Sequence, residues 1–151
     1  MAINEYEVLF ICAANVGRSQ IAEGFYNHYR GDRKAISAAA KEDKREKYSF
    51  RPHPGVTQVM QEKGIDISSQ IVKLLTPNMI GRAKIIVMLC GPESCPDYLL
   101  KAQNLQITPV DDGYVLGSDP VSELMRFRTA RDNIEAIVIA LIKELGHEIQ
   151  Q

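Results

Sequence analysis

Four short apolar segments recur along the chain, separated by longer and more polar stretches. They are residues 7–11, 35–38, 85–89 and 105–110. Each has the length of a β-strand, and the segment 85–89 is apolar throughout, which is typical of a strand in a parallel sheet that is covered on both faces. The pattern therefore predicts four strands, of which the third is buried on both sides.

Apolar residues at helical spacing fill much of the intervening sequence. Residues 21–29 predict a helix that ends at Gly31, and residues 56–60 predict a second helix with Gly64 as its C-terminal cap. The last predicted helix is long and closes at Gly146. Its core side carries Leu124, Phe127, Ile134, Ile137, Val138, Leu141 and Leu145. Strands and helices thus alternate over most of the chain.

Composition and charge limit the classes of protein to which this chain can belong. Its 151 residues fit a single domain, 1–151, and 45% hydrophobic and 25% charged residues are ordinary for a soluble globular protein. A net charge of −1 gives no general attraction to nucleic acid or to an anionic membrane. No apolar run approaches the roughly 20 residues that span a bilayer, and no secretory segment is visible, so we expect a cytoplasmic protein. Three cysteines, an odd number, favour reactive thiols over a static disulfide framework.

The most informative stretch follows the first predicted strand. The strand ends at Cys12, small residues follow, and Arg18-Ser19 open the first helix. The backbone amides of such a loop form a concave anion site, and the helix adds its unpaired N–H groups and the positive end of its dipole. A thiol in that field should ionise below its reference pKa of about 8.5, and its thiolate is a nucleophile. The sequence therefore predicts that Cys12 is a nucleophile in an oxyanion cradle.

Other residues of this loop have definite expected roles. Arg18 presents a planar fork for two oxygens of a tetrahedral oxyanion, Ser19 donates a hydrogen bond to the thiolate, and Asn15 braces the loop in left-handed backbone geometry. The alternative is that Cys12 only packs at the end of a buried strand, but the ordered context favours the functional interpretation. The predicted oxyanion-binding residues are Ala13, Ala14, Asn15, Val16, Gly17, Arg18 and Ser19.

The segment 10–24 resembles the phosphate-binding loop of the low-molecular-weight protein tyrosine phosphatase superfamily, which also contains thiol-linked arsenate reductases. The resemblance runs over nearly the whole chain and implies an α/β fold: a single three-layer domain with a four-stranded parallel sheet flanked by helices. Gln20 and Gly24 resemble the reductase branch, since phosphatases usually have proline at the position of Gln20. Gly17 departs from both branches, which commonly carry a second cysteine there, and Ala39 stands where a glycine is usual.

A second thiol-bearing stretch follows the third predicted strand. Cys90 comes directly after residues 85–89, and Cys95 lies a short turn away. Because parallel strands open their carboxyl ends onto one crevice, we expect Cys90 at the same sheet edge as Cys12. The segment resembles the redox cysteine pair of thioredoxin-linked arsenate reductases, which implies that Cys90 attacks a Cys12–arsenic adduct and that Cys95 then becomes its disulfide partner. The alternative is two incidental thiols, one buried and one in a loop.

A general acid is expected near the start of the last helix. In the superfamily this residue is the aspartate of an Asp-Pro pair just before that helix, so the resemblance implies Asp119. Asp111 and Asp112 are rivals, since either could lie nearer the loop. Without the resemblance, Asp119 is equally well explained as a cap or turn residue.

Two further features receive no catalytic role. The mixed-charge run 41–47 is interpreted as a solvated loop, with a rim that contacts a protein partner as the alternative. The histidines His28, His53 and His147 have no ligand spacing, so we predict no metal site. No cofactor is implied.

Three functions remain. We favour an arsenate reductase that acts through a cysteine disulfide cascade and is regenerated by a thioredoxin-like reductant. The alternative is a low-molecular-weight protein tyrosine phosphatase that hydrolyses phosphate monoesters such as phosphotyrosine through a cysteinyl-phosphate. The cysteine pair and Gln20 favour reduction, whereas the unusual cysteine spacing and Gly17 oppose it. The third hypothesis is a non-catalytic oxyanion-binding module, which the presence of Cys12, Arg18 and Asp119 opposes.

Overall fold

The centre of the structure, a computed structural model that describes residues 5–150, is a parallel β-sheet. Residues 1–4 and 151 of the expected domain 1–151 lie outside the described range. Along the chain the elements are β1 (Tyr6–Cys12), α1 (Arg18–Arg30), β2 (Ala35–Ala39), α2 (Pro54–Gln61), α3 (Pro77–Ile80), β3 (Ala83–Met88), η1 (Pro92–Ser94), α4 (Asp97–Leu100), β4 (Leu105–Ile107) and α5 (Pro120–Glu144). The strands pair in the order β2-β1-β3-β4, all of them parallel.

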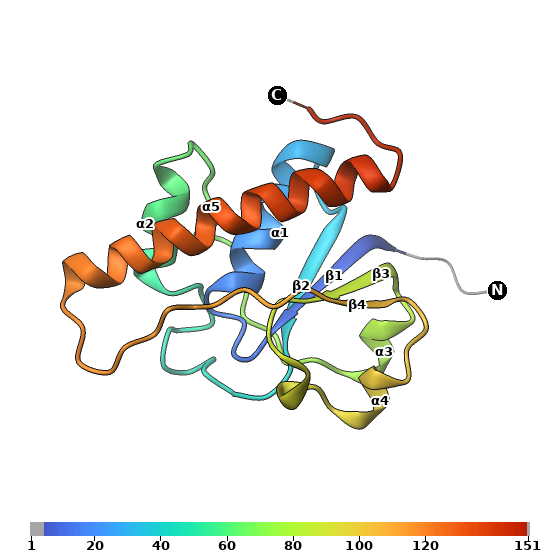
Figure 1. Cartoon of the computed structure of the whole chain (residues 1–151), viewed down its shortest axis with the longest axis horizontal. Helices are drawn as coiled ribbons and strands as arrows, with labels where there is room; N and C mark the ends of the chain where they lie inside the picture. The colour runs from blue at the N-terminus through green and yellow to red at the C-terminus, as the bar shows by residue number, and fades with distance from the viewer. Residues whose placement is uncertain (1–4, 151) are drawn as a thin grey trace.

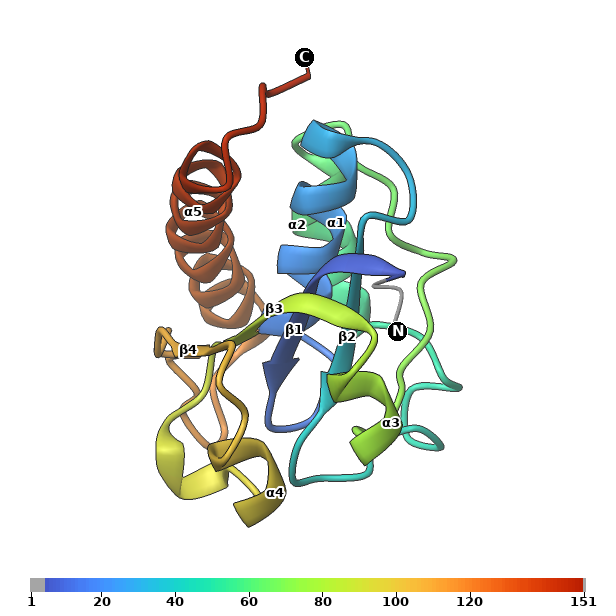
Figure 2. The same ribbon diagram turned by 90° about the vertical axis from the view of Figure 1, so that its right-hand side faces the viewer.

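Helices cover both faces of the sheet (Figure 1). The helices α1, α2 and α5 lie on one face, and the short α3 and α4 lie on the other, as Figure 2 shows from the side. Side chains of β1 alternate between the two layers: Val8 and Phe10 pack in the core beneath α1 and α5, whereas Leu9 and Ile11 pack in the core beneath α3 and α4. All four are fully buried. The predicted three-layer α/β fold is thereby confirmed.

The fourth strand is shorter than predicted. We expected a strand over residues 105–110, but regular pairing with β3 ends at Ile107. Pro109 has no N–H group to donate to a ladder, so it interrupts the strand. The N–H groups of Thr108 and Val110 still donate to the carbonyls of Met88 (2.8 Å) and Leu89 (3.0 Å), so the chain continues beside the end of β3.

Glycines end the second and last helices, as predicted. Gly64 has a φ of 74°, and its N–H donates to Gln61 O at 2.9 Å, while Ile65 N donates to Met60 O at 3.1 Å. This pair of bonds is a Schellman motif, which satisfies carbonyls that the helix leaves free. Gly146, with a φ of 79°, ends α5 in the same way. Among the helices of residues 5–150, none combines the length and the apolarity that crossing a bilayer requires.

Gly24 lies where α1 packs most tightly. A Cβ atom at this position would lie 2.7 Å from Ile67 Cγ2 and 3.2 Å from Met60 Cε, and both of these residues are fully buried. We expect Gly24→Ala to lower the free energy of unfolding, measured by urea denaturation, by about 1–2 kcal/mol. The reason is that overpacking costs about 1–3 kcal/mol, whereas the gain in helix propensity is at most about 1 kcal/mol.

Gly81→Ala is the matched control. Gly81 has a φ of −77°, and the nearest atom to its Cβ position is 3.9 Å away. We expect this variant to change the stability by no more than about 0.5 kcal/mol. If Gly24→Ala is as stable as the native protein, then Ile67 moves aside without cost and the packing argument is wrong.

Candidate active site

The loop between β1 and α1 carries the predicted nucleophile. Cys12 is the last residue of β1, and α1 begins at Arg18, with Gly17 as an N-cap residue that provides no side-chain cap. Within residues 5–150, the N–H groups of Ala14, Val16, Gly17 and Arg18 donate to no protein acceptor. These free donors, together with the N-terminal end of α1, are suited to an oxyanion.

Asn15 holds this loop from within. It is fully buried and has a φ of 59°, which lies in the left-handed region. Its Nδ2 donates to Ser19 Oγ at 2.6 Å and to Ser37 Oγ at 2.8 Å. Its Oδ1 accepts from Gln20 Nε2 at 3.0 Å and from Lys73 N at 2.9 Å. The amide therefore uses both donors and both acceptor positions, and ties the loop to α1, to β2 and to the segment before α3.

The buried carboxylate of Glu23 extends the hydrogen-bond network of Asn15 through Ser37. Ser37 Oγ donates to Glu23 Oε1 at 2.8 Å, and Lys73 Nζ lies 3.8 Å from the same oxygen. Burial raises the pKa of Glu23 and lowers the pKa of Lys73. Both groups thus support the loop from the side that faces away from the cavity described next.

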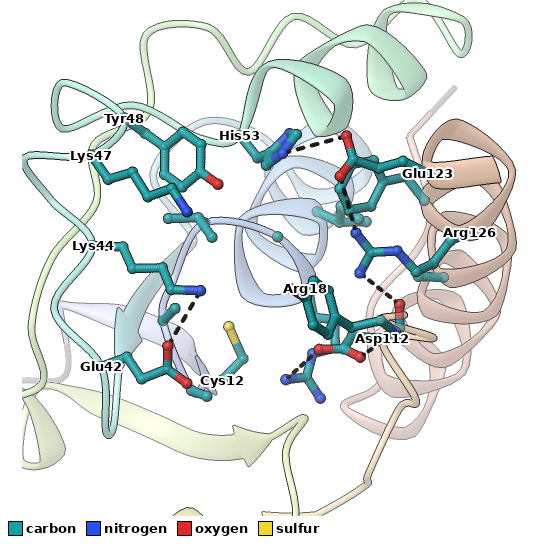
Figure 3. Close-up of a pocket in the computed structure, with 18 residues that line it drawn as sticks. Cys12, Arg18, Glu42, Lys44, Lys47, Tyr48, His53, Asp112, Glu123 and Arg126 are labelled. Atoms are coloured by element: carbon teal, nitrogen blue, oxygen red, sulfur yellow. Dashed lines mark hydrogen bonds and ion pairs between the residues drawn. The ribbon is translucent and has the colours of Figure 1, made fainter. Parts of the chain in front are cut away.

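The sulfur of Cys12 lines a cavity of about 410 Å³ (Figure 3). Its Sγ lies 2.9 Å from Ser19 Oγ and accepts a hydrogen bond from Asn15 N at 3.3 Å. Because Ser19 Oγ already accepts from Asn15 Nδ2, its own hydrogen is free to point at the sulfur. Cys12 is only 3% exposed, so reagents reach it through the cavity.

Arg18 also faces the cavity and is anchored by one nitrogen. Its Nη1 donates to Leu89 O at 3.1 Å and to Val110 O at 2.8 Å, two carbonyls that follow β3 and β4. Its Nη2 lies 3.9 Å from Asp112 Oδ2. The guanidinium is therefore held by the ends of two strands and keeps further donors for a ligand.

The aspartates that compete for the role of general acid lie in different environments. Asp112 lines the cavity beside Arg18 (Figure 3). Asp119 is exposed and caps α5: Ser122 N donates to its Oδ1 at 2.8 Å and Ser122 Oγ to its Oδ2 at 3.2 Å. These hydrogen bonds hold the pKa of Asp119 below its usual value. The described lining of the cavity includes neither Asp119 nor Asp111, whose carboxylate accepts from Gly113 N.

Cys90 and Cys95 lie on the α3–α4 side of the sheet and are both free thiols. Cys90 is buried, and burial raises the pKa of its thiol to about 11, with the charge of Cys12 acting in the same direction. The charge of Arg18 opposes this shift, and that of Cys95 adds to it. The described lining of the cavity includes Cys12 but neither Cys90 nor Cys95. Cys95 is half-buried, and burial raises its pKa as well.

The opposite wall of the cavity was missed by sequence reasoning. Part of it comes from the run 41–47, which we interpreted as a solvated loop: Lys44 and Lys47 line the cavity, and Lys44 Nζ lies 3.3 Å from Glu42 Oε2 (Figure 3). The high density of charged residues in that run is the sequence signal that could have indicated this wall of the cavity. Glu123 and Arg126 also line the cavity. They gave no signal, because an acid and a base three residues apart on a helix resemble an ordinary surface pair.

Comparison with known proteins gives a consistent result. A sequence profile of the family described as low molecular weight phosphotyrosine protein phosphatase matches residues 7–151. An arsenate reductase of Shouchella clausii (strain KSM-K16) is 35% identical over 91 residues, which cover 59% of this chain and 61% of that protein.

Solved structures give the same family. A thioredoxin-dependent arsenate reductase of Corynebacterium glutamicum matches with a TM-score of 0.64 and 26% identity, over 93% of this chain and 62% of that one. An arsenate reductase in a phosphate-binding state matches with a TM-score of 0.66 and 27% identity, over 92% and 98% of the two chains. The matches span about three fifths of the Shouchella and Corynebacterium proteins. Because the family profile extends over almost the entire chain, this protein belongs to the low molecular weight phosphotyrosine protein phosphatase family, in which it matches the arsenate reductases.

Proposed function

We propose that this protein is a thiol-dependent arsenate reductase that converts arsenate to arsenite. The observation that carries the proposal is the arrangement of its three cysteines. Cys12 faces the cavity at the end of β1, Cys90 is buried just after β3, the strand that pairs with β1, and Cys95 follows the short η1 turn. The arsenate reductases among its relatives support the same activity.

The first step is a displacement at arsenic. Arsenate binds to the free loop amides and to Arg18, and the Cys12 thiolate attacks the arsenic atom. A sulfur–arsenic bond forms and an arsenic–oxygen bond breaks. Asp112, which lies in the cavity near Arg18, donates a proton to the leaving oxygen, which departs as water. The arsenic of this adduct is still pentavalent.

The second step is the reduction. The Cys90 thiolate attacks the sulfur of Cys12, so that a disulfide forms and the sulfur–arsenic bond breaks. The electron pair of the broken bond remains on arsenic, which leaves as arsenite. Cys95 then attacks Cys90 and frees Cys12. A thioredoxin-type dithiol reduces the resulting Cys90–Cys95 disulfide by exchange, for which Cys95, the least buried of the three cysteines, is suited.

Hydrolysis of phosphate monoesters is the second candidate function. At roughly 30 Å³ per water-sized group, a tetrahedral oxyanion fills only part of a cavity of about 410 Å³. Tyr48, Tyr114 and Phe127 line the remaining space and would contact the organic group of an ester. In that case Cys12 forms a cysteinyl-phosphate that water then hydrolyses, and neither Cys90 nor Cys95 takes part.

Substitution of the cysteines distinguishes these activities. Cys12→Ser should abolish turnover of both arsenate and p-nitrophenyl phosphate, because it removes the nucleophile. Cys90→Ser should abolish thioredoxin-coupled release of arsenite but leave p-nitrophenyl phosphate hydrolysis unchanged. Cys95→Ser should stop after one turnover with a Cys12–Cys90 disulfide, which intact-protein mass spectrometry detects.

Other results of these cysteine substitutions would each point to a different function. If arsenate turnover survives both Cys90→Ser and Cys95→Ser, the reductase proposal is wrong. If only the phosphate ester is turned over, the protein is a phosphatase. If neither substrate is turned over but phosphate still binds, the third hypothesis, a non-catalytic oxyanion-binding module, is correct.

The second step should depend strongly on pH. Because burial raises the pKa of Cys90 to about 11, only a small fraction of this thiol is ionised at neutral pH. The thiolate is the attacking species, so the rate of disulfide formation at saturating arsenate should rise about tenfold per pH unit between about pH 7 and pH 9. Alkylation quenching in a single turnover, with Cys90→Ser as the blank, measures this rate. A rate that does not change over this range would contradict attack by Cys90.

Two alanine variants test the general acid. We expect Asp112→Ala to lower kcat by about 10²–10³-fold, the usual effect of losing a general acid. Asp119→Ala should leave kcat nearly unchanged but lower the free energy of unfolding by about 1 kcal/mol, because it removes the N-cap of α5. Steady-state kinetics and urea denaturation measure the two effects. The reverse pattern would assign the acid to Asp119.

A further inference from the structure

The turn that carries Asp112 packs against one side chain of α5, that of Arg126. Arg126 Nη1 donates to Asp112 O at 3.1 Å, and its Cζ lies 5.5 Å from the centre of the Tyr114 ring and 4.5 Å from that of Phe127. Figure 3 shows the guanidinium between Glu123 and Asp112. The contacts therefore hold the turn on both sides of Gly113.

Gly113 shows how closely the turn and this side chain approach. Its φ is +65°, and a Cβ atom would lie 2.9 Å from Arg126 Cγ and 3.2 Å from Arg126 Cδ. The backbone of the turn thus rests directly on the aliphatic part of Arg126, at a distance that only glycine allows.

Glu123 and His53 connect the Arg126 side chain to the Cys12 loop. Its Nη2 lies 3.6 Å from Glu123 Oε2, and Glu123 Oε1 lies 3.7 Å from His53 Nε2. The backbone N–H of His53 donates to Val16 O, in the Cys12 loop, at 2.9 Å. A continuous series of contacts therefore joins the nucleophile loop to the turn of Asp112 around the cavity.

We propose that Arg126 is a positioning residue for the general acid. Arg126 bonds to the main-chain oxygen of Asp112 and leaves the carboxylate free to act. Of the two carboxylate oxygens, Oδ1 accepts from Tyr114 N at 2.8 Å and Oδ2 faces Arg18 at 3.9 Å. Arg126 thereby fixes the distance between the acid and the leaving oxygen of the bound oxyanion. This inference rests on the role proposed above for Asp112.

The kinetic test compares single and double variants. Because a misplaced catalytic group loses rate steeply with distance, we expect Arg126→Ala to lower kcat by about 10–100-fold with little change in KM. Arg126→Lys, which keeps the charge and part of the stem, should lie between this variant and the native protein. In an Asp112→Ala background, Arg126→Ala should cause no further loss, because Arg126 acts through Asp112.

A structural readout accompanies the kinetics. The N–H of Tyr114 donates to the Asp112 side chain, and the N–H of Gly113 to the Asp111 side chain, so their hydrogen exchange reports the order of the turn. Both amides should exchange faster in Arg126→Ala. Arg128→Ala is the matched control: it removes the same type of side chain from the same helix, but one that pairs with Glu62, outside the cavity lining. It should change neither exchange nor kcat.

Gly113→Ala provides a second route if Arg126→Ala proves unstable. The added methyl group pushes the turn away from Arg126, so kcat should fall while KM changes little, again with no further loss when Asp112 is absent. Losses that add to that of Asp112→Ala would overturn the proposal. If Asp112→Ala lowers kcat and Arg126→Ala does not, only the positioning role fails. If Asp112→Ala leaves kcat unchanged, the proposed acid fails, and the positioning role fails with it.

Discussion

The rest of the site depends on the hydrogen bonds that the side-chain amide of Asn15 makes. A loop whose N–H groups remain free for a ligand gains little order from its own backbone, so another group has to hold it. The amide does this with four hydrogen bonds at a buried position of left-handed geometry. Because the same side chain orients the hydroxyl of Ser19, it also determines how the sulfur of Cys12 is hydrogen-bonded. The sulfur of Cys12 is therefore positioned by buried polar groups and only indirectly by hydrophobic packing.

Charges of both signs surround the cavity. The described lining includes four cationic side chains, those of Arg18, Lys44, Lys47 and Arg126, and three carboxylates, those of Glu42, Asp112 and Glu123. In the proposed function, the loop amides and Arg18 would select the oxyanion, because they act over hydrogen-bonding distance and are sensitive to the shape of the ligand.

The fold could be predicted from the sequence to a large extent, because strand-length apolar runs, helical spacing and glycine caps act over a few residues. The exception is the segment 105–110, where a single proline shortened a strand whose hydrophobic pattern continued. The residues of the Cys12 loop could also be named from the sequence, since they are contiguous, but their anchors Ser37 and Lys73 lie far away along the chain. The position of the aspartates was less predictable. The resemblance implies Asp119 as the acid, whereas the path of the chain between Val110 and α5 places Asp112 in the described lining of the cavity and Asp119 at the N-terminus of α5.

The hydrogen bond from Leu89 N to Ile11 O, at 2.7 Å, joins the residues that directly precede Cys90 and Cys12. The pairing of Ile11 with Met88 sets Cys12 opposite Leu89, whereas Cys90 packs in the core beneath α3 and α4. Linking the two sulfurs would therefore require a new course for the short connection that leaves Leu89 towards Cys95. In the proposed reaction, the segment between β3 and α4 is therefore the part of the chain in which an oxidised form would differ from the reduced form.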